Sequence, residues 1–166
     1  MVGRPIFITW RLYGTLPEGR AFSFDLTSGQ AFVAMDRLLD EARTGPSYMR
    51  RAEIVCIVSD AIEHWRDRYE LYAWVVMANH VHILITPTVE VAKITKSLKW
   101  FTAREANKVL GLKGPFWQDE SYDRLVRNPA EFERIRKYIE WNPVRAGLVK
   151  TPEEYPWSSA SWVNES

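Results

Sequence analysis

The chain has 166 residues, of which 46% are hydrophobic and 26% charged, and its formal net charge is +1. These values are ordinary for a globular protein and predict one domain, over residues 1–166, with a hydrophobic core. The single cysteine excludes an internal disulfide framework, and no apolar run reaches the roughly 18 residues of a membrane span. Because the N-terminus also lacks a signal-peptide pattern, we expect a cytoplasmic protein that makes no membrane contact.

The charge is distributed unevenly along the chain. Residues 1–90 hold 9 Lys or Arg against 11 Asp or Glu, a net of −2, whereas residues 91–150 hold 13 against 7, a net of +6. The near-neutral total therefore conceals a basic segment, which is typical of a surface that contacts nucleic acid. Some of the eight tryptophans could serve as stacking platforms there, although most are expected to pack.

The first half of the chain predicts a strand, two helices and a hairpin. Residues 5–14 are rich in β-branched and aromatic residues and end at a glycine, as a strand does. Apolar residues recur at helical spacing within residues 26–46 and again within residues 50–70. Two apolar runs in residues 71–87 surround Ala78-Asn79 and predict a β-hairpin.

The second half predicts a long helix over residues 91–111, a strand within residues 115–127 and a last helix. That helix is expected to open at Pro129 and to close at Pro143. The complete order predicts an α+β fold, with a ferredoxin-like antiparallel sheet and helices packed on one face. The fold would carry one extra helix before the central hairpin.

Two of the chain's three histidines, His80 and His82, stand inside the apolar run "VVMANHVHILITP". Side chains alternate along a strand, so both imidazoles should lie on one face, about 7 Å apart. Two buried imidazoles are costly unless they are hydrogen-bonded in the interior or bind a metal ion together. The pattern alone leaves both interpretations open, and a metal site would need a third ligand.

The last predicted helix offers candidates for that ligand and for a nucleophile. Tyr138 and Asn142 are four residues apart, along the edge of an apolar stripe that includes Ile135 and Ile139. Either could have an ordinary role, since tyrosine packs well at such an edge and an asparagine before proline can end a helix.

The helix predicted over residues 91–111 carries a single-signed face. Four basic residues fall within about 120° of arc around one tryptophan at helical spacing: Lys93, Lys96, Trp100, Arg104 and Lys108. A solvated helix face usually mixes charge signs, whereas this pattern suits phosphate neutralisation combined with base stacking. Further DNA contacts are expected from four residues in or beside the following strand: Trp117, Gln118, Arg124 and Arg127.

Several blocks together resemble a known family. "VVMANHVHILITP" resembles the His-hydrophobic-His core of the single-tyrosine, IS200-like transposases. "FWQDESYDRLVRN", "ERIRKYIEWNPVRAGLV" and "YPWSS" resemble the REP-associated tyrosine transposases, in the same order, and "FITWRLYG" resembles the first strand. Ala78 stands where a proline is usual before the Asn-His pair, and this changes the turn but no ligand.

The resemblance implies a metal-dependent endonuclease and strand transferase that acts on single-stranded or hairpin DNA. Residue by residue, it implies His80 and His82 as metal ligands, Tyr138 as the nucleophile and Asn142 as a polar third ligand. The ion would be Mg²⁺ or Mn²⁺, and Tyr138 would form a 5′-phosphotyrosine. It also implies a nucleoid-associated protein, either a monomer or a homodimer.

Two alternatives differ in class. A catalytically idle protein derived from a transposase could bind hairpin DNA without cleaving it, although an intact Tyr138 argues against this. A two-histidine phosphoesterase of the RNA-ligase-like type needs a second histidine motif, which this sequence lacks. Tyr122 is the one rival to Tyr138 as nucleophile that we consider.

Overall fold

The computed structural model describes residues 2–15, 28–42 and 45–164. Its helices and strands, in chain order, are β1 (Ile6–Leu12), α1 (Ser28–Glu41), α2 (Ala52–His64), β2 (Tyr69–Val76), β3 (His80–Pro87), α3 (Val91–Leu110), β4 (Trp117–Leu125) and α4 (Pro129–Arg145). Among the described residues, no helix is both long enough and apolar enough to cross a membrane.

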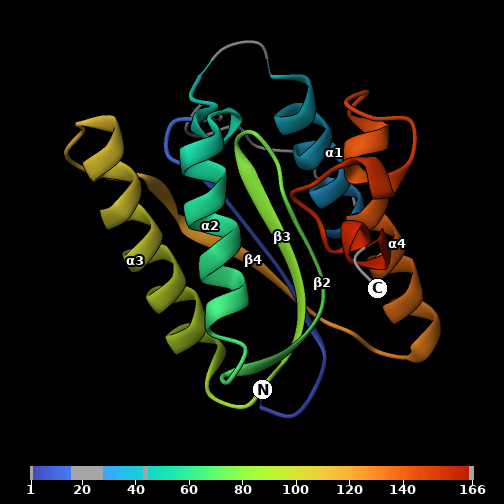
Figure 1. The fold of residues 1–166 in the computed structure, drawn as a ribbon. Coiled ribbons are helices and arrows are strands. Elements are labelled where there is room, and N and C mark those ends of the chain that lie inside the picture. Colours follow the sequence, from blue (N-terminus) through green and yellow to red (C-terminus); the bar gives the residue numbers. More distant parts are fainter. Residues whose placement is uncertain (1, 16–27, 43–44, 165–166) are drawn as a thin grey trace.

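The four strands form one antiparallel sheet in the order β2-β3-β1-β4 (Figure 1). Strands β1 and β3 lie in the centre, because both are apolar along nearly their whole length and are buried on both faces. This order, with α2 and α3 as the connections between strands, is the ferredoxin-like arrangement that the sequence predicts, and the α+β fold class is confirmed. The extra helix predicted before the hairpin is present, and α1 occupies the additional place, between β1 and α2.

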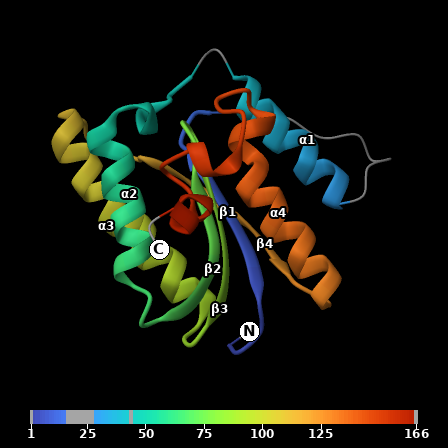
Figure 2. The ribbon, with the colours of Figure 1, turned by 45° about the vertical axis from the view of Figure 1, so that its right-hand side comes forward.

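The helices cover both faces of the sheet, so the prediction that they pack on one face is wrong (Figure 2). Helices α2 and α3 pack on the face that carries Ile83, while α1 and α4 pack on the face that carries Leu84. Both residues are fully buried, as alternation along β3 requires for a strand between two helical layers. The chain therefore has two hydrophobic clusters separated by the sheet.

Helix α4 continues through Pro143 to Arg145, whereas the sequence predicts that it closes at Pro143. The proline lacks one backbone N–H and therefore one hydrogen bond, but it is buried in the layer and the helix tolerates it two residues before its end. The first turn is well formed, because the side chain of Asn128 accepts a hydrogen bond from the Glu131 N–H at 2.9 Å. Tyr138 and Asn142 thus keep regular helical spacing and lie one turn apart.

The two-layer arrangement predicts that Leu84→Ala destabilises the protein as much as Ile83→Ala does. Each substitution should lower the free energy of unfolding by about 2–5 kcal/mol, because each leaves a cavity in a separate cluster. Val109→Ala is the control, since Val109 is exposed on α3 and should cost less than about 0.5 kcal/mol. Urea unfolding followed by circular dichroism measures all three. A negligible cost for Leu84→Ala would contradict the second layer.

Candidate functional site

Strand β3 places His80 and His82 on the face covered by α1 and α4. Both side chains are fully buried, and their ring centroids are 4.9 Å apart. The alternation of β3 puts Val81 and Ile83 on the other face, so the two imidazoles are polar interruptions in an apolar layer. Buried imidazoles need polar partners, and the surrounding elements supply them.

The partner common to both histidines is Asp36, on α1. Its Oδ1 atom lies 3.1 Å from His80 Nε2 and 3.0 Å from His82 Nε2, and the residue is 1% exposed. Burial alone would raise the pKa of the Asp36 carboxyl, but the charge and hydrogen bonds of the two histidines hold it well below its usual range. A carboxylate and two imidazoles therefore meet at one buried point.

Two neighbours fix the orientation of the rings. Asn79 donates from Nδ2 to the carbonyl of Leu39 on α1 at 2.9 Å, so its Oδ1 atom faces His80 Nδ1 at 2.7 Å. Because an amide oxygen only accepts, Nδ1 of His80 carries a proton, and whenever the ring is neutral its Nε2 lone pair faces Asp36. On β1, the Thr9 hydroxyl lies 2.6 Å from His82 Nδ1 and holds the second ring.

This arrangement fits a divalent cation. Nε2 of His80 is buried without a well-aligned hydrogen bond, and it faces a carboxylate oxygen across 3.1 Å. Two such electron pairs repel one another unless a cation or a proton lies between them. Adjacent ligands of an octahedral ion with bonds of about 2.1 Å are about 3 Å apart, which matches both spacings to Asp36. Asp36, His80 and His82 could therefore hold a metal ion together.

Asn142, predicted from the sequence as the third ligand, lies at the edge of this group. It is fully buried, and its Nδ2 atom donates to Asp40 Oδ2 at 2.9 Å, while the other Asp40 oxygen lies 3.7 Å from His80 Nε2. Asn142 Oδ1 and Asp40 Oδ1 are buried without a hydrogen bond. Burial, as the largest cause, raises the pKa of Asp40 to about 6. Asn142 thus remains a candidate ligand, beside a second carboxylate near His80.

Tyr138 shares Asp36 with the histidines. Its hydroxyl donates to Asp36 Oδ2, so the carboxylate contacts the phenol through one oxygen and both imidazoles through the other. Burial, and next the negative charge of Asp36, raise the pKa of the Tyr138 phenol above its ordinary value. Tyr122, the rival nucleophile, stacks on Phe32 at 4.3 Å, and no hydrogen bond or ion pair links it to either histidine.

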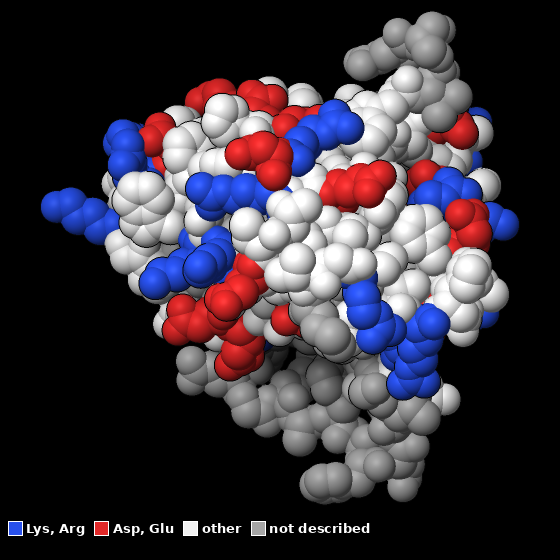
Figure 3. Space-filling model, turned by 90° about the horizontal axis from the view of Figure 1, so that it is seen from below, with Lys and Arg blue, Asp and Glu red and all other residues white. Residues whose placement is uncertain are grey.

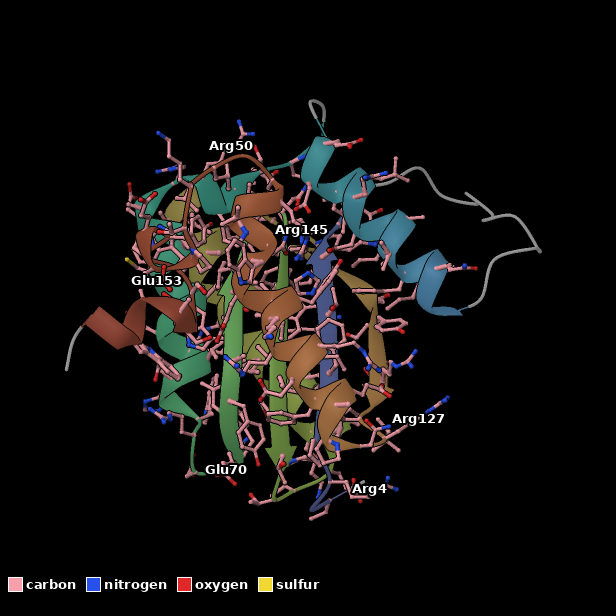
Figure 4. The ribbon with its side chains drawn as sticks, turned by 90° about the vertical axis from the view of Figure 1, so that its right-hand side faces the viewer. Arg4, Arg50, Glu70, Arg127, Arg145 and Glu153 are labelled. Carbon is pink, nitrogen blue, oxygen red and sulfur yellow. The ribbon has the colours of Figure 1, made fainter. Side chains whose placement is uncertain are left out.

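Arg145 is the cation that stands against Tyr138 from outside. Its guanidinium carbon lies 4.0 Å from the centre of the Tyr138 ring, and Nη2 donates to the Tyr138 carbonyl at 2.6 Å. Figure 4 shows Arg145 near the seam between α1 and α4. A groove of about 760 Å³ opens along this seam and is lined by Asp36, Asp40, Tyr138 and Arg145, among others. The candidate site is thus accessible from the α1–α4 side.

The basic face of α3 lies in the other helical layer. The sheet separates it from the histidines, because α3 packs with α2 on the opposite face. Trp100 is 61% exposed, and the Arg104 guanidinium lies 5.0 Å from the centre of its ring. Basic side chains project at the α3 side of the view in Figure 3, although acidic groups are mixed among them. On α3, Glu105 pairs with both Arg104 and Lys108.

The other four predicted DNA contacts are dispersed. Trp117 is buried and its indole N–H donates to the Thr102 hydroxyl at 2.8 Å, so it offers no exposed ring for stacking. Gln118 is half-buried, and its carbonyl accepts from Lys99 Nζ. Arg124 pairs with the buried Glu131 at 2.8 Å on the α1–α4 side of the sheet. Arg127 is exposed at the opposite end of the sheet from Arg145 (Figure 4).

A family model described as "Transposase IS200 like" matches residues 51–142, more than half of the sequence, and the chain belongs to this family. A REP-associated tyrosine transposase of Escherichia coli (strain K12) is 33% identical over 99 residues, covering 57% of this chain and 56% of that relative. The match thus spans about half the length of that protein. These findings confirm the resemblance identified in the sequence.

A solved structure of the REP-associated tyrosine transposase bound to a REP hairpin is similar in fold. It has a TM-score of 0.60 and 22% sequence identity, over 96% of this chain and 78% of that chain. At that identity the likeness establishes the fold alone. Helix α1, with Asp36 and Asp40, lies before the stretch that the family model matches. The carboxylates of this site therefore come from a part of the chain that the family model does not cover.

Removal of the Asp36 charge should weaken Mn²⁺ binding by more than about tenfold, because Asp36→Asn takes the only carboxylate from the group formed with the two histidines. Asn142→Ala should weaken Mn²⁺ binding by about tenfold, as the loss of an orienting or peripheral ligand does. Isothermal titration calorimetry measures both affinities. Asp60→Asn is the control, since Asp60 is exposed on α2 in the other layer. Unchanged affinity in Asp36→Asn would remove Asp36 from the metal site.

Proposed function

We propose that this chain is a metal-dependent single-stranded DNA endonuclease and strand transferase that acts on hairpin DNA through a covalent bond to Tyr138. One observation carries the proposal: the Tyr138 hydroxyl and the two histidines contact opposite oxygens of the same buried carboxylate, Asp36. A nucleophile next to a metal donor set is the arrangement that phosphoryl transfer requires. Two similar proteins, one of them bound to a REP hairpin, support hairpin DNA as the partner.

The metal would be Mg²⁺ or Mn²⁺, held by His80, His82 and Asp36, with Asn142 as a candidate further ligand. When bound, a divalent ion supplies neutralisation of the phosphate charge and polarises phosphorus towards attack. Asn79 and Thr9 would keep the two Nε2 atoms directed at the ion, since each holds the other nitrogen of one ring.

Tyr138 would attack the phosphorus atom through its phenolic oxygen. The new bond joins that oxygen to phosphorus, the bond from phosphorus to the 3′ oxygen breaks, and the 3′ oxygen leaves as a hydroxyl. Asp36 accepts the hydrogen bond from the phenol and so stands where it can take the proton during attack. Arg145 holds the ring from the groove side by its contact with the ring face.

The covalent link explains why a side chain, rather than water, would be the nucleophile. The 5′-phosphotyrosine conserves the phosphodiester, so a second 3′-hydroxyl can attack it, release Tyr138 and join new DNA. Water would end the reaction at hydrolysis. Tyr138 is half-buried and Asp36 is buried, which limits the access of water to this bond.

The exposed face of α3 is proposed as a separate DNA-binding surface. Lys93, Lys96, Trp100 and Arg104 are exposed there and can contact phosphates and bases outside the cleavage site. Since the sheet lies between α3 and Tyr138, one DNA molecule would have to pass around the protein edge to contact both surfaces. Arg124, on the side of Tyr138, is closer to the cleaved strand.

Tyr138→Phe should abolish the covalent protein–DNA adduct while the protein stays folded, because only the nucleophilic oxygen is removed. The assay is incubation with hairpin DNA and Mg²⁺, followed by a denaturing gel and mass mapping of the modified peptide. Tyr122→Phe is the matched control and should form the adduct normally. An adduct on Tyr122, or normal cleavage by Tyr138→Phe, would overturn the mechanism. Hairpin binding by the wild-type protein without any adduct would favour the catalytically idle alternative.

Neutralisation of Lys93, Lys96 and Arg104 together to Gln should flatten the dependence of hairpin affinity on salt. The slope of log affinity against log salt should fall by about one unit for each DNA phosphate that the variant no longer neutralises. Fluorescence anisotropy between about 50 and 200 mM salt measures the slope. A control variant with Arg51, Arg66 and Lys150 changed to Gln removes the same charge elsewhere. Equal slopes in the two variants would place the DNA-binding surface away from α3.

A further inference from the structure

A second cavity adjoins Tyr138. It has a volume of about 180 Å³ and lies between α1, β4 and α4. Its lining consists of aromatic and aliphatic side chains with two arginines: Phe7, Gly29, Phe32, Val33, Tyr122, Arg124, Arg134, Ile135 and Tyr138. The volume is below the range of drug-sized ligands, so the cavity suits a small flat group.

Aromatic rings that contact one another form part of the cavity wall. Phe32 and Tyr122 stack at 4.3 Å, and the ring of Tyr138 lies 6.1 Å from that of Phe32. Aromatic walls offer a flat group the same faces that they offer one another. In a protein that acts on single-stranded DNA, the flat apolar group available in every nucleotide is the base.

The rim of the cavity is positively charged. Arg134 is exposed on α4 and makes no hydrogen bond or ion pair with any described residue. Arg124 uses its Nε atom to pair with Glu131, which fixes the guanidinium beside the cavity. Guanidinium groups at the entrance can bind the phosphate or the base edge of a nucleotide whose ring enters.

The cavity is next to the groove that leads to the metal donor set. Both are lined by Gly29, Val33 and Tyr138, and Asp36 lines only the groove. A strand that lies in the groove with its phosphate at Tyr138 therefore has a neighbouring base at the entrance of the aromatic cavity. The cavity uses α1 residues, and these lie before the stretch that the family model matches.

We propose that this cavity binds one unpaired nucleobase, that of a nucleotide next to the phosphate attacked by Tyr138. The base packs against the Phe32, Tyr122 and Tyr138 rings that line the cavity, and Arg134 contacts its edge or its phosphate. The inference rests on the proposed function, which it deepens by assigning a base-binding site. It makes cleavage depend on one flanking base that is extruded from the strand.

The test uses a series of REP-type hairpin oligonucleotides with a single-stranded flank. Each oligonucleotide carries one abasic site at a different position of the flank, and its affinity for the protein is measured. The Tyr138→Phe variant is used with Mg²⁺ present, because it keeps the ring and prevents cleavage. One abasic position should weaken binding by at least about fivefold, as loss of a stacked base does. The same oligonucleotides are then tested with Val33→Trp added to Tyr138→Phe, because the tryptophan should fill the cavity from its exposed position on α1. In this double variant, the abasic site should no longer weaken binding.

Val109→Trp is the matched control, since Val109 is a similarly exposed helix valine on α3. It should retain the sensitivity to the abasic site. As a second readout, 2-aminopurine at the sensitive position should lose fluorescence on binding, and Val33→Trp should prevent this loss. Hairpin binding with no sensitive position, or sensitivity that survives Val33→Trp, would overturn the base-binding cavity alone. Failure of the protein to bind the hairpin at all would overturn the proposed function and, with it, the cavity's role.

Discussion

The contact between the Asp36 carboxylate and two fully buried imidazoles is the constraint on which the α1–α4 side of the molecule depends. A carboxylate that is 1% exposed has lost its hydration, and only cations or strong donors can compensate. His80, His82 and Tyr138 face it from three directions. The same concentration of polar groups that costs stability in an apolar layer creates a place for a divalent ion and a nucleophile.

This polar centre explains why the sheet has helices on both faces. The layer formed by α2 and α3 is almost wholly apolar and supplies an ordinary core. The layer formed by α1 and α4 encloses the histidines, and Asn79 joins it to the β2–β3 turn through the Leu39 carbonyl. Without α1, the strand face with His80 and His82 would lack its carboxylate and the cavity beside Tyr138 would lose one wall. The candidate site therefore depends on a helix that a four-stranded ferredoxin-like core does not need.

Much of this can be predicted from local patterns. Hydrophobic periodicity locates every strand and helix, and alternation places both histidines on one face. The second helical layer escapes prediction because strand alternation shows that both faces are buried but not what covers each. The role of Asp36 is also not predicted, although the residue lies between Phe32 and Leu39 on the buried stripe of α1, where a charged residue is unusual. Its partners His82 and Tyr138 are 46 and 102 residues away along the chain, so its role depends on tertiary contacts. The effect of Pro143 is smaller than the sequence predicts, because the proline stands two residues before the end of α4 and removes only one backbone hydrogen bond.

The central claim is that Asp36, His80 and His82 form one metal site next to Tyr138. Crystals soaked in Mn²⁺ and measured for anomalous scattering test it most directly, because the signal locates the ion independently of activity. The account predicts one strong peak within about 2.5 Å of Nε2 of both histidines and of an Asp36 oxygen. A crystal that binds Mn²⁺ elsewhere, with Asp36 still in direct contact with both imidazoles, would contradict it.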